Sequence, residues 1–148
     1  MTSTYIIQLC ASLVGTLCFG ILFNIRGLKL IFSAIGGLLS WGLFLLFSMI
    51  ISSEPINYFI VAATVSLYSE IMARILKTPA APIVTTSLIP LIPGGSLYYT
   101  MAYAFESDFE GFLKKAVSTL KLASALALGI IVVTTLSQVL FRKYHIKR

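Results

Sequence analysis

Glu70 and Arg74 are the two residues whose types and spacing point most directly to chemistry. They lie four positions apart near the end of an apolar run, so on a helix they share one face. In one interpretation they form an intrahelical ion pair, with the Arg74 side chain reaching toward water. In the other, the Arg74 guanidinium binds a substrate carboxylate, while Glu70 takes up and releases a proton that is coupled to transport.

A second candidate site is the interruption of the next apolar run at residues 90–95, with the sequence Pro-Leu-Ile-Pro-Gly-Gly. Each proline lacks an N–H group and clashes with the carbonyl four residues earlier. A helix that restarts after such a break offers N–H groups and partial positive charge to a carboxylate. Broken helices bind substrates in transporters, and a proline kink that only serves packing is the alternative. The candidate substrate-binding residues here are Pro90, Pro93, Gly94, Gly95, Ser96 and Tyr98.

The composition predicts a protein that is integral to a membrane. Of the 148 residues, 58% are hydrophobic and 11% are charged, whereas a soluble domain carries about 25% charged residues. The net charge of +6 comes from residues that flank the apolar runs. Such charges set membrane topology and attract anionic lipid, so the bilayer and not a nucleic acid is the expected partner of the basic residues.

The apolar runs predict an all-α integral membrane protein with about five transmembrane helices in a single domain over residues 1–148. The expected spans are residues 5–23, 30–51, 58–76, 83–101 and 116–141, with the fourth broken at the Pro-Leu-Ile-Pro-Gly-Gly segment. Ser107 and Glu110 fit a capping box that begins another helical segment. A straight helix from Asp108 to Phe141 would measure about 50 Å against about 30 Å of hydrocarbon, so we expect a bend near residues 111–115.

The distribution of basic residues predicts the orientation. If all five runs cross the bilayer, eight basic residues lie on one side and two on the other. The more basic side is cytoplasmic, which places the N-terminus outside and the C-terminus in the cytoplasm of the inner (plasma) membrane. A re-entrant loop over residues 83–101 would instead move the basic tail away from Arg26 and Arg74, and the charge count argues against that arrangement.

Three stretches resemble the signature of the threonine/serine exporter (ThrE-type) family. They are Arg74-x4-Pro79, the run Ile89-Pro-Leu-Ile-Pro-Gly-Gly-x-x-Tyr98, and Phe19-Gly-x-x-Phe23-Asn24. The resemblance is strongest to the small, all-membrane subunit of the split two-chain members. It implies export of threonine and serine, or of a dicarboxylate such as succinate. It also implies a larger partner subunit of the same family, in a homo- or hetero-oligomer.

Other classes of function find little support in the residues. The one histidine, His145, lies in the basic tail, so no nucleophile has a histidine partner within the membrane; we expect no enzyme activity, metal site or cofactor. Cys10 and Cys18 are separated by about 12 Å on a helix, too far for a disulfide. The remaining alternative to a transport subunit is a scaffolding membrane subunit that stabilises a partner without binding substrate.

Overall fold

The computed structural model describes residues 2–145, with side chains described for residues 3–139. All the secondary-structure elements of the described residues are helices, as predicted. Its elements, in order, are α1 (Thr2–Leu22), α2 (Leu28–Ser48), α3 (Glu54–Ile75), α4 (Ala80–Leu88), the short 3-10 helix η1 (Ile89–Leu91), α5 (Gly94–Phe105) and α6 (Phe109–His145). The tail residues Lys147 and Arg148, which entered the charge count, lie outside the described residues.

Four helices are long and apolar enough to cross a membrane, and the bent pair formed by α4–η1 and α5 brings the number to five if that pair is one span. Helices α1, α2 and α3 have 21, 21 and 22 residues, or about 32 Å each, close to the hydrocarbon thickness. The prediction of an all-α membrane protein with about five spans is therefore confirmed.

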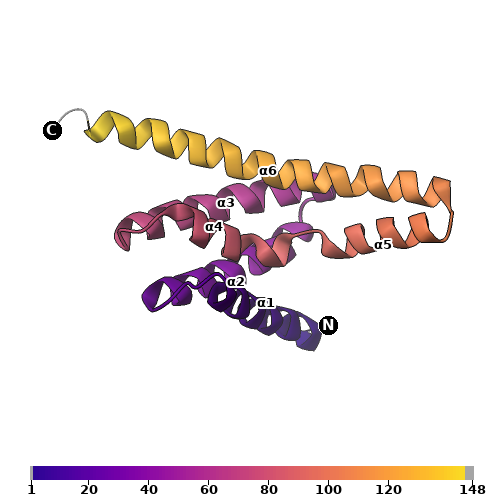
Figure 1. The fold of residues 1–148 in the computed structure, drawn as a ribbon, viewed down its shortest axis with the longest axis horizontal. Helices are drawn as coiled ribbons and strands as arrows, with labels where there is room; N and C mark the ends of the chain where they lie inside the picture. The colour runs from indigo at the N-terminus through magenta and orange to yellow at the C-terminus, as the bar shows by residue number, and fades with distance from the viewer. Residues whose placement is uncertain (1, 146–148) are drawn as a thin grey trace.

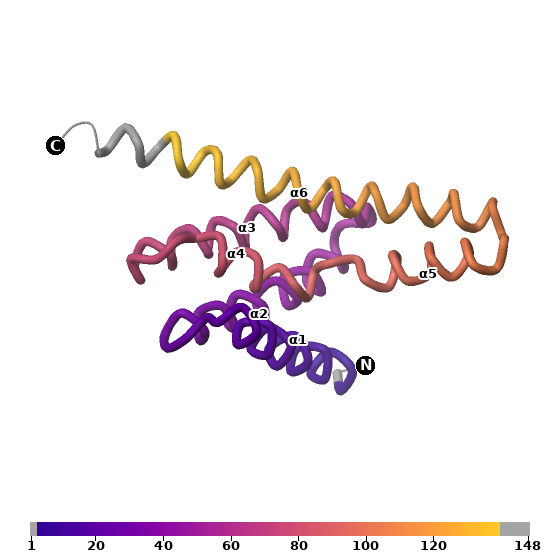
Figure 2. Tube along the Cα trace, in the orientation of Figure 1, coloured from indigo at the N-terminus to yellow at the C-terminus, as the bar shows by residue number. Residues whose placement is uncertain are grey.

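The predicted break is present and bends the chain strongly. The segment Ala80–Leu91 meets the segment Gly94–Phe105 at 61°, and the bend is visible between α4 and α5 in the tube (Figure 2). Pro90 lies within the 3-10 turn, and Pro93 precedes the first residue of α5. Because these prolines cannot donate backbone hydrogen bonds, the helical ladder stops at η1 and restarts at Gly94.

Helices α3 and α6 run in the same direction and pack along each other. An added Cβ on Gly129 would lie 2.7 Å from the Phe59 carbonyl oxygen and 2.9 Å from the Ala62 Cβ, while Ser137 contacts Glu70. The residue numbers rise together along both helices, so the packing is parallel, as Figure 1 also shows. A parallel α3–α6 pair requires the intervening α4–η1–α5 segment to return the chain to the opposite end of the bundle.

The ends of the bundle follow from this order. Figure 1 shows the α1–α2 and α3–α4 connections and the C-terminal end of α6 at one end, with the N-terminus, the α2–α3 connection and the α5–α6 turn at the other. The first end carries Arg26, Lys29 and Lys77, and the second lies nearer to Lys114 and Lys115. The structure thus groups the basic loops at one end, as the charge count expected.

The last helix differs from its predicted form. Residues 109–145 make one continuous helix of 37 residues, and the bend expected near residues 111–115 is not found. Asp108, and not Ser107, caps this helix, because its Oδ1 accepts the backbone N–H of Gly111 at 3.0 Å. The first part of α6 extends together with α5 beyond the ends of α1–α3 (Figure 1). The helix can therefore be longer than the hydrocarbon layer without bending.

The interior of the bundle combines apolar packing with small hydroxyl residues. Val61, Val65, Val84, Leu88 and Leu91 belong to one buried cluster from α3, α4 and η1. Close helix approach depends on small residues, and an added Cβ on Gly36 or Gly37 would collide with Ser87 or Thr16, respectively. The Gly36 contact holds α4, the first half of the broken span, against α2, and the Gly37 contact holds α1 against α2.

Candidate functional site

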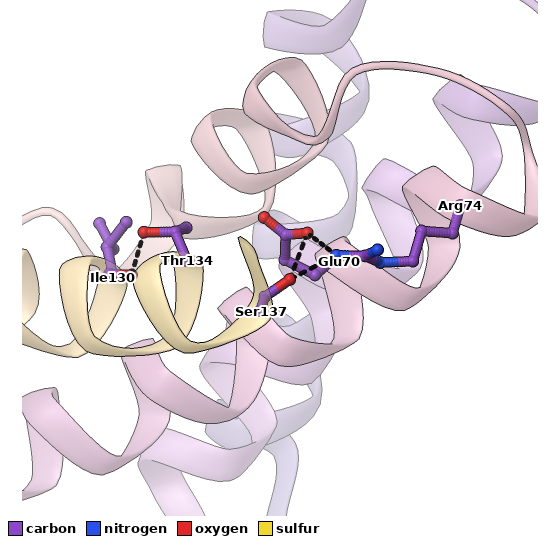
Figure 3. Close-up of polar contacts among 5 residues, drawn as sticks. All are labelled: Glu70, Arg74, Ile130, Thr134 and Ser137. Atoms are coloured by element: carbon purple, nitrogen blue, oxygen red, sulfur yellow. Dashed lines mark hydrogen bonds and ion pairs between the residues drawn. The ribbon is translucent and has the colours of Figure 1, made fainter. Parts of the chain in front are cut away.

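Glu70 and Arg74 form a charged pair in the last turns of α3, and α6 contributes a third member. The Arg74 guanidinium contacts Glu70 Oε2 at 3.0 Å, which is the intrahelical pair that one interpretation of the sequence expected. Ser137 donates a hydrogen bond of 2.8 Å to the same oxygen and accepts one from Arg74. Figure 3 shows the three side chains converging between α3 and α6. We call this cluster the Glu70 node.

The sequence of α3 explains where the node lies. The helix begins with Glu54 and Pro55 in its first turn, and Arg74 lies in its last turn, where a cation is favoured by the helix dipole. Lys77, with a φ of 49°, ends the helical conformation before Pro79. The side chain of Arg74 is 36% exposed, while that of Glu70 is 12% exposed. The carboxylate is therefore the member of the pair that lies inside the bundle.

A groove of about 500 Å³ runs beside the node, between α4 and α6, and is partly open to the surroundings. Its volume is within the range of small-molecule sites. Most of its lining is apolar, and the polar residues that line it are Glu70, Thr85, Thr134 and Gln138. Among the described residues that line the groove, Glu70 is the one charged residue. The groove thus has an acidic, hydroxyl-bearing part and an aliphatic part.

The break lies at the other end of this groove. Ile92, beside the break, and Leu126 both line the groove. Leu126 precedes Ser137 by 11 residues on α6, or about 16 Å. The structure therefore brings Glu70 and Arg74 together but leaves the break at a distance from both. The groove is the feature that connects the two predicted regions.

The residues around the break are more open than the node. Gly94 and Gly95 are exposed, and an added Cβ on either would meet no described atom within 4 Å. Pro90, Pro93 and Ser96 are half-buried, and the Tyr98 side chain is 69% exposed and packs edge-on against Tyr99. The role of these residues in substrate binding stays a prediction.

Sequence reasoning missed three residues of this region, namely Thr134, Ser137 and Gln138. They recur at spacings of three and four within the apolar part of α6, so they share one helix face. Thr134 Oγ1 donates to the Ile130 carbonyl at 2.9 Å, and Gln138 lines the groove. A search for polar residues at helical spacing within the last span would have found all three.

Three further polar atoms within the bundle lack hydrogen-bond partners among the described residues, and one of them is Asn57 Oδ1 near the start of α3. The hydroxyl oxygens of Ser66 and Ser69 are fully buried and unpaired. Ser66 lies one helical turn before Glu70 on the same stripe as Arg74. Unsatisfied hydroxyl groups are costly in an apolar interior, so this stretch of α3 is more polar than packing alone requires.

Comparison with known proteins gives one match. A family model described as "Threonine/Serine exporter, ThrE" matches residues 8–136. This range contains Glu70, Arg74 and the whole break, and it ends one residue before Ser137. No curated protein and no solved structure shows a significant match.

Proposed function

Because the chain belongs to the threonine/serine exporter family, we propose that it is a substrate-handling membrane subunit of a secondary transporter. The proposed cargo is a small carboxylated metabolite, with threonine and serine in the first place and a dicarboxylate such as succinate as the alternative. The observation that carries this proposal is the Glu70 node, a charged cluster at the edge of a groove within an otherwise apolar bundle. Ionisable residues in such positions mark substrate or ion pathways in membrane proteins.

The two charged members of the node have proposed roles. Arg74 is the group for a substrate carboxylate, since its guanidinium already engages the carboxylate of Glu70 and can form paired hydrogen bonds with another. Glu70 is the group that binds a coupling proton. Pro90, Pro93, Gly94, Gly95, Ser96 and Tyr98 are the proposed contributors from the break.

The proposed setting is the inner (plasma) membrane, with the N-terminus outside and the C-terminus cytoplasmic. The basic residues Arg26, Lys29 and Lys77 at one end of the bundle support this orientation, because the more basic side of a membrane protein is cytoplasmic.

We further propose a larger membrane subunit of the same family as partner. Among the described elements, α5 packs extensively against α6 alone. Its exposed side chains include Leu97, Met101 and Phe105. An apolar surface of this kind beyond the other helices is compatible with a second subunit.

Efflux tests the proposal. Cells are loaded with threonine- or serine-containing dipeptides, or separately with succinate, and express the chain alone, with the larger subunit, or with that subunit and the Arg74→Ala chain. We expect efflux only with both subunits, and its loss in the variant while the complex still assembles. Efflux that Arg74→Ala leaves unchanged would favour the scaffolding role, and no efflux in any combination would reject transport of these compounds.

A further inference from the structure

The second oxygen of the Glu70 carboxylate has a different environment from the first. Oε2 accepts from both Arg74 and Ser137, whereas Oε1 has no hydrogen bond within the described part of the chain. Figure 3 shows this oxygen turned away from the two partners of Oε2. Glu70 lines the groove between α4 and α6. A residue whose carboxylate keeps one oxygen with unused lone pairs therefore lines a cavity that is large enough for a small molecule.

We propose that Glu70 Oε1 is the subsite for a positively charged nitrogen, so that the groove selects cargo with an ammonium group. This inference rests on the proposed transport function and deepens it, because it decides between the two classes of cargo named there. An amino acid carries the required group, and a dicarboxylate does not.

The neighbours of Glu70 in the groove suit an ammonium group. An alkylammonium ion has three N–H donors and no acceptor. The Thr134 hydroxyl donates its own proton to the Ile130 carbonyl, which leaves its oxygen available as an acceptor. The side-chain amide of Gln138 supplies a carbonyl oxygen to the same groove. Glu70, Thr134 and Gln138 thus provide three acceptors, one of them charged, for three donors.

The charges around the groove disfavour a doubly anionic cargo. No lysine or arginine is among the described residues that line it, and Glu70 is its one charged lining residue. Arg74 stands directly beside Glu70, at 3.0 Å, so the node presents one negative and one positive group side by side. A zwitterion matches this arrangement, whereas the second carboxylate of a dicarboxylate would lie against Glu70 and be repelled.

The same geometry links cargo binding to the proposed proton coupling. A proton and an ammonium group would compete for one carboxylate, since each neutralises the charge of Glu70. Arg74 is the charged group that faces this carboxylate, and the described residues of α4 and α6 that line the groove contribute none. Binding of cargo and binding of a proton are then mutually exclusive, which is the condition for exchange of one against the other.

The test is binding to the purified chain in lipid nanodiscs, measured by calorimetry with four probes. L-threonine and its methyl ester keep the ammonium group, whereas 3-hydroxybutyrate and succinate lack it. We expect the first two to bind and the last two to bind at least about tenfold more weakly, the loss expected for one charge-assisted hydrogen bond. Equal binding of threonine and 3-hydroxybutyrate would overturn the ammonium subsite and leave the transport proposal standing.

Two variants test whether threonine binding depends on the Glu70 carboxylate and its neighbour in the groove. Glu70→Gln keeps the shape of the side chain and removes its charge, and we expect it to weaken threonine binding at least about tenfold. Because this variant also disturbs the pairing of Arg74, Thr134→Val serves as a second one that leaves the node intact, with a several-fold loss expected. Thr135→Val, one position along α6 and outside the groove lining, is the matched control and should bind threonine normally.

Threonine affinity that neither Glu70→Gln nor Thr134→Val lowers would overturn the assignment of the subsite to these residues. If no probe binds and the assembled pair of subunits exports no amino acid, the transport function itself fails, and the subsite fails with it.

Discussion

Ser137 donates a 2.8 Å hydrogen bond to Glu70 Oε2, the oxygen that also pairs with Arg74, although Ser137 and Glu70 are 67 positions apart in the chain. This contact joins the last helix to the third at the level of the buried carboxylate. Interhelical hydrogen bonds in membrane proteins contribute about 0.6 kcal/mol on average and up to about 1.7 kcal/mol. The node is thus both the proposed site and a hydrogen-bonded contact that stabilises the packing of α3 against α6.

Removing the Ser137 hydroxyl should remove the hydrogen bond between α6 and α3 without removing a charge. We expect Ser137→Ala to lower the free energy of unfolding by about 0.5–2 kcal/mol, measured by thermal or denaturant unfolding of the purified chain in detergent. Ser124→Ala is the control, because the Ser124 hydroxyl is exposed and bonds only to the Lys121 carbonyl of its own helix. Equal stability of both variants would mean that the interhelical bond contributes nothing.

A methyl group at Gly129 should push α3 and α6 apart. Its Cβ would lie 2.7 Å from the Phe59 carbonyl oxygen, which is backbone and cannot rotate away. We expect Gly129→Ala to destabilise the protein by about 1–3 kcal/mol, the usual cost of overpacking. Gly15→Ala, where an added Cβ meets nothing within 4 Å, should be neutral or stabilising by up to about 1 kcal/mol. The same detergent unfolding assay separates the two, and a stable Gly129→Ala would contradict the close helix contact.

The two prolines should be responsible for the bend between α4 and α5. The double variant Pro90→Ala with Pro93→Ala restores two backbone donors and removes two clashes, so we expect the 61° bend to decrease. Spin labels on cysteines introduced at the exposed positions Thr85 and Met101, in a background without native cysteines, should then report a longer distance.

Gly94→Ala is the control for the proline pair, since its added Cβ meets no described atom within 4 Å. It should leave the label distance unchanged. A distance that also stays constant in the double proline variant would show that packing of α4 against α2, and not the prolines, imposes the bend.

Because α3 is long and apolar enough to cross a membrane, we predict that the α2–α3 and α3–α4 connections lie on opposite sides of it. In a variant without Cys10 and Cys18, a cysteine at Ser52 should react with a membrane-impermeant maleimide in intact cells. A cysteine at Thr78 should react only after the cells are permeabilised. Labelling of Thr78→Cys alone in intact cells would reverse the proposed orientation, and equal labelling of both would contradict a crossing by α3.

The features that were predicted correctly from the sequence are those that depend on residues close together in the chain. Runs of apolar residues of about 20 positions are visible without any partner, and so is the effect of Pro90 and Pro93 on a helix. The pairing of Glu70 with Arg74 was also one of the two interpretations, because residues at i and i+4 meet on any helix.

The features that the sequence did not predict depend mainly on contacts between distant parts of the chain. Ser137 reaches Glu70 only because Gly129 lets α6 approach the backbone of α3 closely, and no single segment shows that register. The bend near residues 111–115 was predicted from the length of the helix against the hydrocarbon thickness, and it is absent because the first part of α6 extends with α5 beyond α1–α3. The cap was also misplaced by one residue, since Asp108 and not Ser107 makes the capping bond. The distance between the node and the break likewise follows from how α4 lies along the bundle.

The projecting pair of α5 and the start of α6 acts as a lever. At Gly129, α6 lies close to the α3 backbone, and Phe109 lies 20 residues away, or about 30 Å along the helix. With Gly129 as a fulcrum, a tilt of only about 5° would move the far tip by about 3 Å over that length. A change in the contacts of Ser137, on the short arm of this lever, would thus be amplified into a displacement that a neighbouring molecule at the tip could sense.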